Sequence, residues 1–168
     1  MNISKVTSAC MLAMAFSTAL ADENEVSTSV YERGRYVVAT SGCNDCHTPG
    51  YAESGGTLPI SEWLTGVAVG FQGPWGTTYP ANLRLSVLDK SEGEWLARAR
   101  QPMRPPMPWF SLREMNDSDL KAVYYFIRSL GPSGEPAPSY AKPGQIVKTP
   151  YIEFVPKNLP TETTAKAP

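Results

Sequence analysis

The apolar positions repeat with a helical period in three parts of the chain. Between residues 30 and 40 they recur every three or four residues, which predicts a helix. A capping box formed by Ser91 and Glu94 opens a second, shorter helix that Pro102 ends. The third and clearest helix spans residues 116–130, and its apolar stripe consists of Leu120, Val123, Tyr124, Ile127 and Leu130.

The segments between and after these helices lack a persistent period. Residues 48–83 are rich in Gly, Pro and Thr and carry scattered aromatic residues, which predicts an extended loop wrapped around something apolar. The proline-rich segment 103–109 can form neither a helix nor a central strand. Residues 132–168 hold eight prolines, which predicts an extended tail. We expect its apolar patch at 151–155 to dock on the domain, the alternative being contact with a partner.

The N-terminal residues 1–21 are typical of a cleaved secretory signal peptide. Lys5 precedes a short apolar stretch, and Ala19-Leu20-Ala21 is a small-x-small cleavage signal before Asp22. Neither this stretch nor any later one is long enough to span a bilayer, so we expect no transmembrane segment in the mature chain. The predicted organisation is therefore a signal peptide over 1–21, a domain over 22–131 and the tail over 132–168.

The charge balance argues against a nucleic-acid partner. Without Lys5 the mature chain would carry 14 basic and 16 acidic side chains. The segment from Arg98 to Arg113 contains four arginines and no acidic residue, whereas residues 22–62 carry seven acidic and two basic side chains. The basic segment could guide docking to an acidic partner, although a solvated face without a special role is as good an interpretation.

The sequence Cys43-Asn44-Asp45-Cys46-His47 is the strongest chemical signal in the chain. Such a motif is compatible with haem attachment, a redox dithiol or half of a zinc site. His47 is the only histidine, and Cys10 would leave with the signal peptide, so a four-ligand zinc site lacks ligands. The strand–helix alternation of a thioredoxin-like protein is also absent. The motif therefore predicts one covalent haem c, with thioethers at Cys43 and Cys46 and its iron bound by His47.

The second axial ligand of the iron has several candidates. The chain has no other histidine, so a methionine, a lysine or an open position remain. Met107 lies between two prolines whose fixed dihedrals would stiffen the segment, and it is the favoured candidate. Met103 is less constrained by its neighbours, and Met115 is more simply explained by packing.

These motifs together resemble bacterial mono-haem class I cytochromes c over roughly residues 30–131. The haem motif, the Tyr79–Leu83 and Pro105–Trp109 segments and the last helix carry the resemblance. It implies a small all-α class I cytochrome c fold, with three to four helices and long loops wrapped around one covalently bound haem. It also implies that Met107 is the sixth ligand and that Gly34 contacts the region of residues 125 and 126. Arg84 departs from the pattern, since relatives commonly have Thr there.

The function that the sequence predicts is one-electron transfer in the periplasm. With both axial positions filled, the iron has no vacant site for chemistry, so we expect a carrier and not an enzyme. Expected partners are redox proteins: an exported dehydrogenase as donor and an oxidase or another cytochrome as acceptor. A cytochrome subunit of an exported dehydrogenase is the main alternative. An open-site haem enzyme or sensor is disfavoured because no distal histidine is available.

Overall fold

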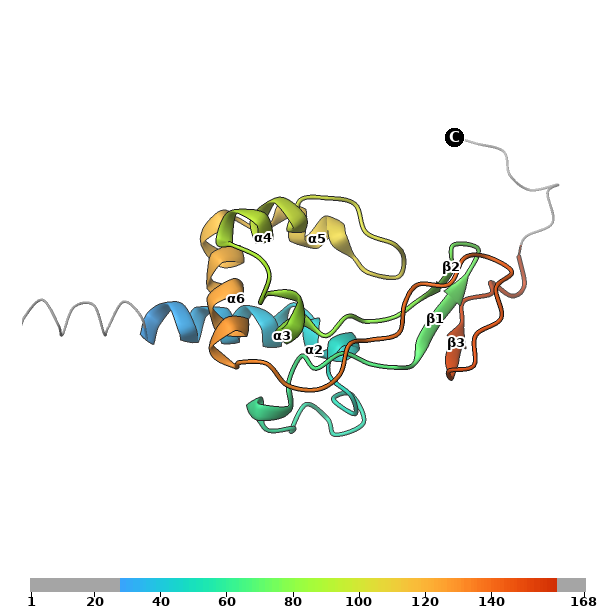
Figure 1. Cartoon of the computed structure of the whole chain (residues 1–168), viewed down its shortest axis with the longest axis horizontal. Coiled ribbons are helices and arrows are strands. Elements are labelled where there is room, and N and C mark those ends of the chain that lie inside the picture. Colours follow the sequence, from blue (N-terminus) through green and yellow to red (C-terminus); the bar gives the residue numbers. More distant parts are fainter. Residues whose placement is uncertain (1–27, 160–168) are drawn as a thin grey trace, which may run out of the picture.

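The computed structural model describes residues 28–159, so the predicted signal peptide and residues 160–168 lie outside it. Helices make up most of its regular structure (Figure 1), and the all-α prediction is confirmed, with a small sheet added. The described elements are, in order, a helix covering residues 28–40, α2 (Cys43–His47), the 3-10 helix η2 (Ile60–Glu62), β1 (Gly70–Gly73), β2 (Gly76–Thr78), α3 (Leu83–Ser86), α4 (Glu92–Ala99), α5 (Trp109–Glu114), α6 (Asp117–Ser129) and β3 (Tyr151–Glu153).

The first described helix and α6 cross at Gly34 (Figure 1). A Cβ atom on Gly34 would lie 2.1 Å from the Ala122 carbonyl oxygen and 2.6 Å from the Cβ of Phe126, so only glycine permits this approach. Arg33 fixes the crossing by donating hydrogen bonds of 2.6 and 2.9 Å to the carboxylate of Asp119. The expected contact between Gly34 and the region of residues 125 and 126 is therefore confirmed at Phe126.

The core of the domain forms around α6. Asn116 caps this helix, since its side chain accepts a 2.7 Å hydrogen bond from the Asp119 N–H. Gly131 ends the helix with a φ of 67°. Full burial of a large apolar side chain contributes about 1.5–3 kcal/mol. One cluster of mutually packed buried residues forms this core, namely Val37, Val38, Trp63, Leu64, Val87, Val123, Tyr124, Phe126 and Ile127.

The short helix α4, which its capping box predicted, is attached to α6 by side-chain hydrogen bonds. Ser91 and Glu94 form both hydrogen bonds of the capping box. The Trp95 indole donates to the Leu120 carbonyl at 3.2 Å, and the Tyr124 hydroxyl donates to the Lys90 carbonyl at 2.7 Å. These contacts fix the point from which the proline-rich loop leaves α4.

The small sheet was not predicted from the sequence. Its strand order is β2-β1-β3, with β1 antiparallel to β2 and parallel to β3. The strands have three or four residues each, and β1 both begins and ends with glycine, so no alternation of apolar and polar positions could develop. Figure 1 shows the sheet at the end of the molecule away from α4 and α6.

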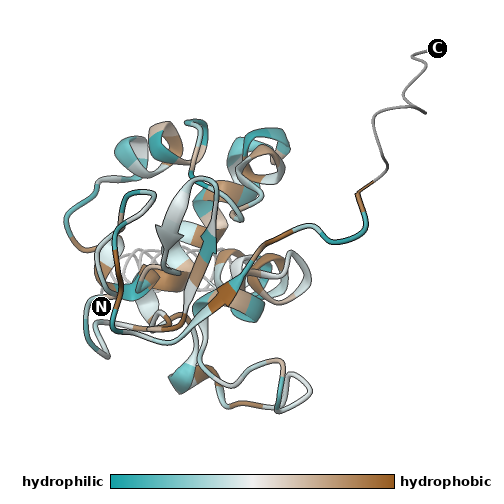
Figure 2. Ribbon diagram, turned by 90° about the vertical axis from the view of Figure 1, so that its right-hand side faces the viewer, coloured by the Kyte–Doolittle hydropathy of each residue, from teal (hydrophilic) through white to brown (hydrophobic). Residues whose placement is uncertain are grey.

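The C-terminal segment returns to the domain and supplies β3, which pairs with β1. The prediction that its apolar patch docks on the domain is therefore confirmed for the backbone of this patch. The Phe154 ring lies 5.8 Å from the rings of both Phe71 and Trp75. Figure 2 shows the apolar colour of this segment at the surface. Its large apolar side chains remain 40–52% exposed, namely Tyr151, Ile152, Phe154 and Val155. The domain boundary between residues 131 and 132 stays a prediction.

Candidate haem site

The two motif cysteines lie on one turn of the short helix α2. Gly42 is the N-cap residue and has a left-handed backbone (φ 71°, ψ 17°) that glycine adopts without strain. Cys43 and Cys46 are free thiols and partly buried. Burial raises the pKa of the Cys43 thiol to about 11 and also raises the pKa of Cys46. Before a haem is attached, burial therefore favours the protonated thiol at both positions on this helical turn.

The His47 ring follows the second thiol directly and is 8% exposed. Its Nδ1 atom donates a 2.7 Å hydrogen bond to the Ala81 carbonyl oxygen. Burial lowers the pKa of His47, which favours the neutral ring. Since Nδ1 carries the proton in this hydrogen bond, the lone pair of a neutral imidazole lies on Nε2, where a metal can bind.

The loop that carries the Ala81 carbonyl is fixed by backbone hydrogen bonds. The Gly66 N–H donates to the His47 carbonyl at 2.8 Å, and the Val67 N–H donates to the Pro80 carbonyl at 3.1 Å. Gly66 has a φ of 80°, and a Cβ atom there would lie 2.6 Å from the backbone nitrogen of Asn82. Gly66 and Val67 therefore join the motif to the loop that orients its histidine.

Asn82 holds the same loop from its other side. Its side-chain oxygen accepts a 3.1 Å hydrogen bond from the Leu85 N–H and so caps α3. Its side-chain nitrogen donates to the carbonyls of Ser133 and Glu135 at 2.8 and 3.2 Å. This one buried amide thus connects the start of α3 to the first residues of the C-terminal segment.

A second buried amide lies within the motif itself. The Thr48 hydroxyl donates to the Asn44 side-chain oxygen at 2.8 Å and accepts a 2.8 Å hydrogen bond from the Leu64 N–H. The Nδ2 atom of Asn44 has no hydrogen-bond partner among the described residues. Buried N–H groups usually have an acceptor, so this atom is suited to a further group or water beside the motif.

Arg84 stands in α3 where the resemblance leads one to expect Thr. Its buried guanidinium reaches the C-terminal end of α6. Its Nε atom donates to the Gly131 carbonyl at 2.6 Å, and its two terminal nitrogens donate to the carbonyls of Ser61 and Leu130. Burial lowers the pKa of Arg84. The carbonyl end of a helix attracts a cation, so Arg84 clamps α3 to α6 without a carboxylate. Its departure from the family pattern was the signal that sequence reasoning left unused.

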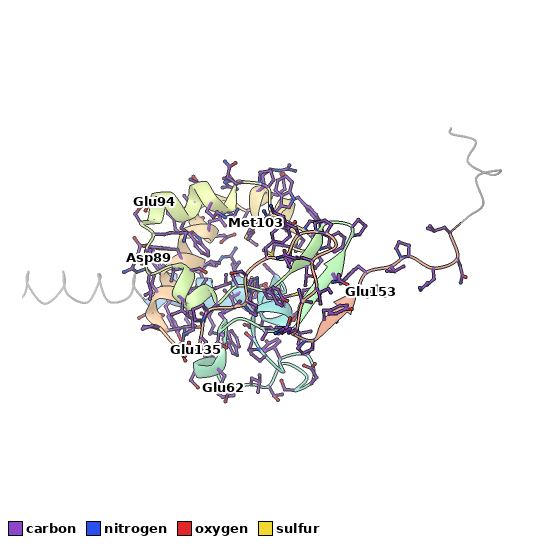
Figure 3. All side chains as sticks on the ribbon, turned by 45° about the vertical axis from the view of Figure 1, so that its right-hand side comes forward. Glu62, Asp89, Glu94, Met103, Glu135 and Glu153 are labelled. Atoms are coloured by element: carbon purple, nitrogen blue, oxygen red, sulfur yellow. The ribbon has the colours of Figure 1, made fainter. Side chains whose placement is uncertain are left out.

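The candidate distal ligands lie outside α2. Met107 and Met103 are both partly buried on the loop between α4 and α5, where Figure 3 labels Met103. The Trp109 N–H donates to the Met107 carbonyl at 2.8 Å, and the Thr78 hydroxyl donates to the Pro105 carbonyl at 2.7 Å. Met115 packs against the hydrophobic core. The structure thus groups three motif residues on one helix and places the methionine candidates on a separate segment.

The residues of this site suit a covalently attached haem. The two free thiols match the two vinyl groups that form thioether bonds, and the adjacent imidazole keeps Nε2 for the iron. The Asn44 amide leaves one buried N–H pair for an acceptor. Within residues 28–159, none of the helices combines the length and the apolar character that crossing a membrane requires.

Comparison with known proteins identifies the class to which this fold and site belong. The family model described as Cytochrome c matches residues 31–131, which is more than half of the chain. The chain therefore belongs to the cytochrome c family. Its cofactor is covalently bound haem c with iron, the group that carries electrons in cytochromes c.

The curated relatives are components of dehydrogenases. A nicotinate dehydrogenase subunit of Pseudomonas putida is 28% identical over 126 residues, covering 67% of this chain and 10% of the relative. The cytochrome c subunits of the quinone alcohol dehydrogenases of Gluconacetobacter polyoxogenes and Komagataeibacter europaeus are 26% identical, covering 80% of this chain and 30% of each relative. The chain thus spans less than a third of the length of these relatives. No solved structure gave a significant match.

Proposed function

We propose that this protein is a periplasmic electron-transfer cytochrome whose single haem c is bound axially by His47 and Met107. Cys43 and Cys46 would form the thioether bonds, and the Nε2 atom of His47 would bind the iron. The observation that carries this proposal is the 2.7 Å hydrogen bond from the His47 Nδ1 atom to the Ala81 carbonyl. This bond holds the ring in the tautomer that an iron ligand requires.

The chain's own residues keep the site suited to electron transfer. When bound, the haem supplies reversible one-electron change between Fe(II) and Fe(III). Burial lowers the pKa of His47 and so favours the neutral ring that donates its lone pair. A thioether ligand at Met107 favours reduced iron and raises the potential. With His47 and Met107 both as ligands, the iron would offer no position to a substrate, and the protein would act as a carrier without catalysis of its own.

We place the carrier beside an exported dehydrogenase, because the curated relatives are named as dehydrogenase components. The dehydrogenase is the electron donor, and an oxidase or another cytochrome is the acceptor. The predicted signal peptide over residues 1–21 supports a periplasmic location. A permanent subunit and a free carrier differ in assembly alone, and gel filtration of the native protein from its source separates the two.

The axial ligand is tested by replacing each methionine of the α4–α5 loop. We expect Met107→Ala to abolish the methionine–iron charge-transfer band, lower the midpoint potential and open the iron to carbon monoxide and imidazole. Met103→Ala is the matched control, because Met103 lies on the same loop and is also partly buried. An unchanged potential in Met107→Ala, or loss of the band in Met103→Ala, would overturn the assignment of Met107.

The periplasmic location is tested on the mature protein. N-terminal sequencing of the haem-containing protein from a periplasmic extract is expected to begin at Asp22. Detection of the full sequence from Met1, or of the haem protein in the cytoplasmic fraction, would contradict export with cleavage.

A further inference from the structure

The described residues of the tail, 132–159, follow the part of the chain that the family model matches. They are nevertheless bound to the domain along most of their length. The Thr77 and Ala141 backbones exchange two hydrogen bonds of 2.8 and 3.0 Å. Further on, the hydroxyls of Tyr79 and Thr149 share a 2.5 Å hydrogen bond, and β3 pairs with β1. The tail is therefore built into the sheet that β1 and β2 begin.

The tail also contacts residues 103–108, here called the strap, which carry Met107. The Arg104 guanidinium lies over the Tyr140 ring, with its Cζ atom 4.0 Å from the ring centroid. The Tyr140 hydroxyl donates a 2.8 Å hydrogen bond to the Trp75 carbonyl, on the turn between β1 and β2. Tyr140 thus binds the strap with its ring face while its hydroxyl is anchored on the hairpin.

A second contact reaches the strap at the next residue. The Thr78 hydroxyl donates a 2.7 Å hydrogen bond to the Pro105 carbonyl. Thr78 directly follows Thr77, whose backbone holds Ala141. Arg104 and Pro105 are therefore both held by one surface, which combines the end of β2 with residues 140 and 141 of the tail.

We propose that Tyr140 is a positioning residue that keeps the strap in place and thereby holds Met107 at the iron, an inference that rests on the proposed His47–Met107 ligation. An external ligand can bind the iron only when the strap moves and Met107 leaves. Its apparent affinity therefore scales with the fraction of molecules in which the strap is open. Contacts of the strap with Tyr140 lower this fraction. The tail then has a defined task, which is to keep the distal side of the haem closed.

The proposal is tested on the mature, haem-containing protein with Tyr140→Ala and Tyr140→Phe. The first variant removes both the ring under Arg104 and the hydroxyl on Trp75, and the second removes the hydroxyl alone. Tyr36→Ala is the matched control, because Tyr36 is 54% exposed and also stacks with an arginine, Arg33, at 5.5 Å on the first helix. Thermal unfolding and circular dichroism establish that each variant is folded.

Two measurements report how often the strap opens. In the ferric protein, we expect the apparent affinity for imidazole to rise about five- to tenfold in Tyr140→Ala, from the loss of a cation–π contact and a hydrogen bond. A rise of about twofold is expected in Tyr140→Phe, and none in Tyr36→Ala. Hydrogen exchange of the backbone amides of residues 103–109 is expected to accelerate in the same order. This second measurement does not depend on which residue binds the iron.

The outcomes separate this inference from the proposed ligation. If the wild-type protein lacks the methionine–iron band, the ligation proposal fails. Hydrogen exchange of the strap amides alone then decides whether Tyr140 holds the strap. If the band is present but Tyr140→Ala matches Tyr36→Ala in imidazole affinity and in exchange, the positioning role is overturned. Should Tyr140→Ala not fold, Arg104→Gln removes the same stacking contact from the strap side and is read by the same measurements.

Discussion

The Nδ1 atom of His47 and the carbonyl oxygen of Ala81 lie 2.7 Å apart, although 34 residues separate them in the chain. This hydrogen bond joins the haem motif on α2 to the loop before α3. It gives the histidine a fixed orientation that the motif alone does not supply. The stability of that loop therefore bears on the proposed iron site.

Gly66→Ala is expected to disturb this connection. Gly66 has a φ of 80°, and an added Cβ would lie 2.6 Å from the backbone nitrogen of Asn82, the residue after Ala81. We expect a loss of about 2–5 kcal/mol in the free energy of unfolding, from backbone strain and steric overlap. Denaturant unfolding of the haem-containing protein measures it. Gly55→Ala is the control, because Gly55 has a φ of 64° but open space around it, and we expect a cost of about 1–2 kcal/mol. Equal losses in the two variants would contradict the steric argument.

Gly34→Ala tests the crossing of the first helix with α6. The added methyl group would overlap the backbone carbonyl of Ala122, which cannot move without displacing α6. We expect a loss of about 3 kcal/mol or more, measured by thermal or denaturant unfolding. Gly93→Ala serves as the comparison, since Gly93 lies in α4 with nothing within 4 Å of the new atom. That variant is expected to gain about 0.5–1 kcal/mol. A similar loss in both would mean that the close approach at Gly34 is unimportant.

Arg84→Met tests the clamp between α3 and the end of α6. The substitution keeps an apolar stem but removes the donors to the carbonyls of Ser61, Leu130 and Gly131. We expect a loss of about 2–4 kcal/mol in the free energy of unfolding, because buried acceptors lose their partners. Arg98→Met, at an exposed position, is expected to stay within about 0.5 kcal/mol of the wild type. Equal denaturant midpoints for Arg84→Met and Arg98→Met would contradict a stabilising role of the Arg84 side chain.

Asp119 is expected to shape the acid side of the stability profile. The hydrogen bonds from the Arg33 guanidinium hold the pKa of this carboxyl below its ordinary value of 3.8. The unfolded chain therefore binds the proton first as the pH falls, so this stabilisation is present above 3.8 and is lost progressively below it. Asp119→Asn is expected to be less stable than the wild type at neutral pH and to show a flatter profile in acid. Unfolding free energies between about pH 5 and pH 2 test this, and parallel profiles would contradict it.

The sequence predicted those features whose signals lie close together in the chain. Asn116, the apolar stripe and Gly131 define α6 within one short segment, and the capping box does the same for α4. The haem motif was found for the same reason, since its thiols and imidazole lie within five consecutive residues. The contact of Gly34 with Phe126 came from the family resemblance, because no local pattern specifies which helix approaches a glycine.

Features that depend on distant backbone groups were not predictable in this way. A carbonyl has the same chemistry in every residue, so nothing in the sequence marks Ala81 as the acceptor for His47. β1 and β3 pair across about half of the chain and are too short to show a period. Helix α5 begins after Pro108 without a side-chain cap, so it lacks the usual start signal. Arg84 departs from the family pattern in the sequence, but its three acceptors are backbone carbonyls from two other segments.

The position of Tyr140 in the chain also bears on how the protein matures. The haem motif lies in the first third of the sequence, whereas Tyr140 and β3 lie in its last quarter. During synthesis from the N-terminus, the two cysteines therefore emerge well before the residues that we propose to hold the strap. Under the proposed role of Tyr140, haem attachment can precede closure of the strap, and residues near the C-terminus close it last.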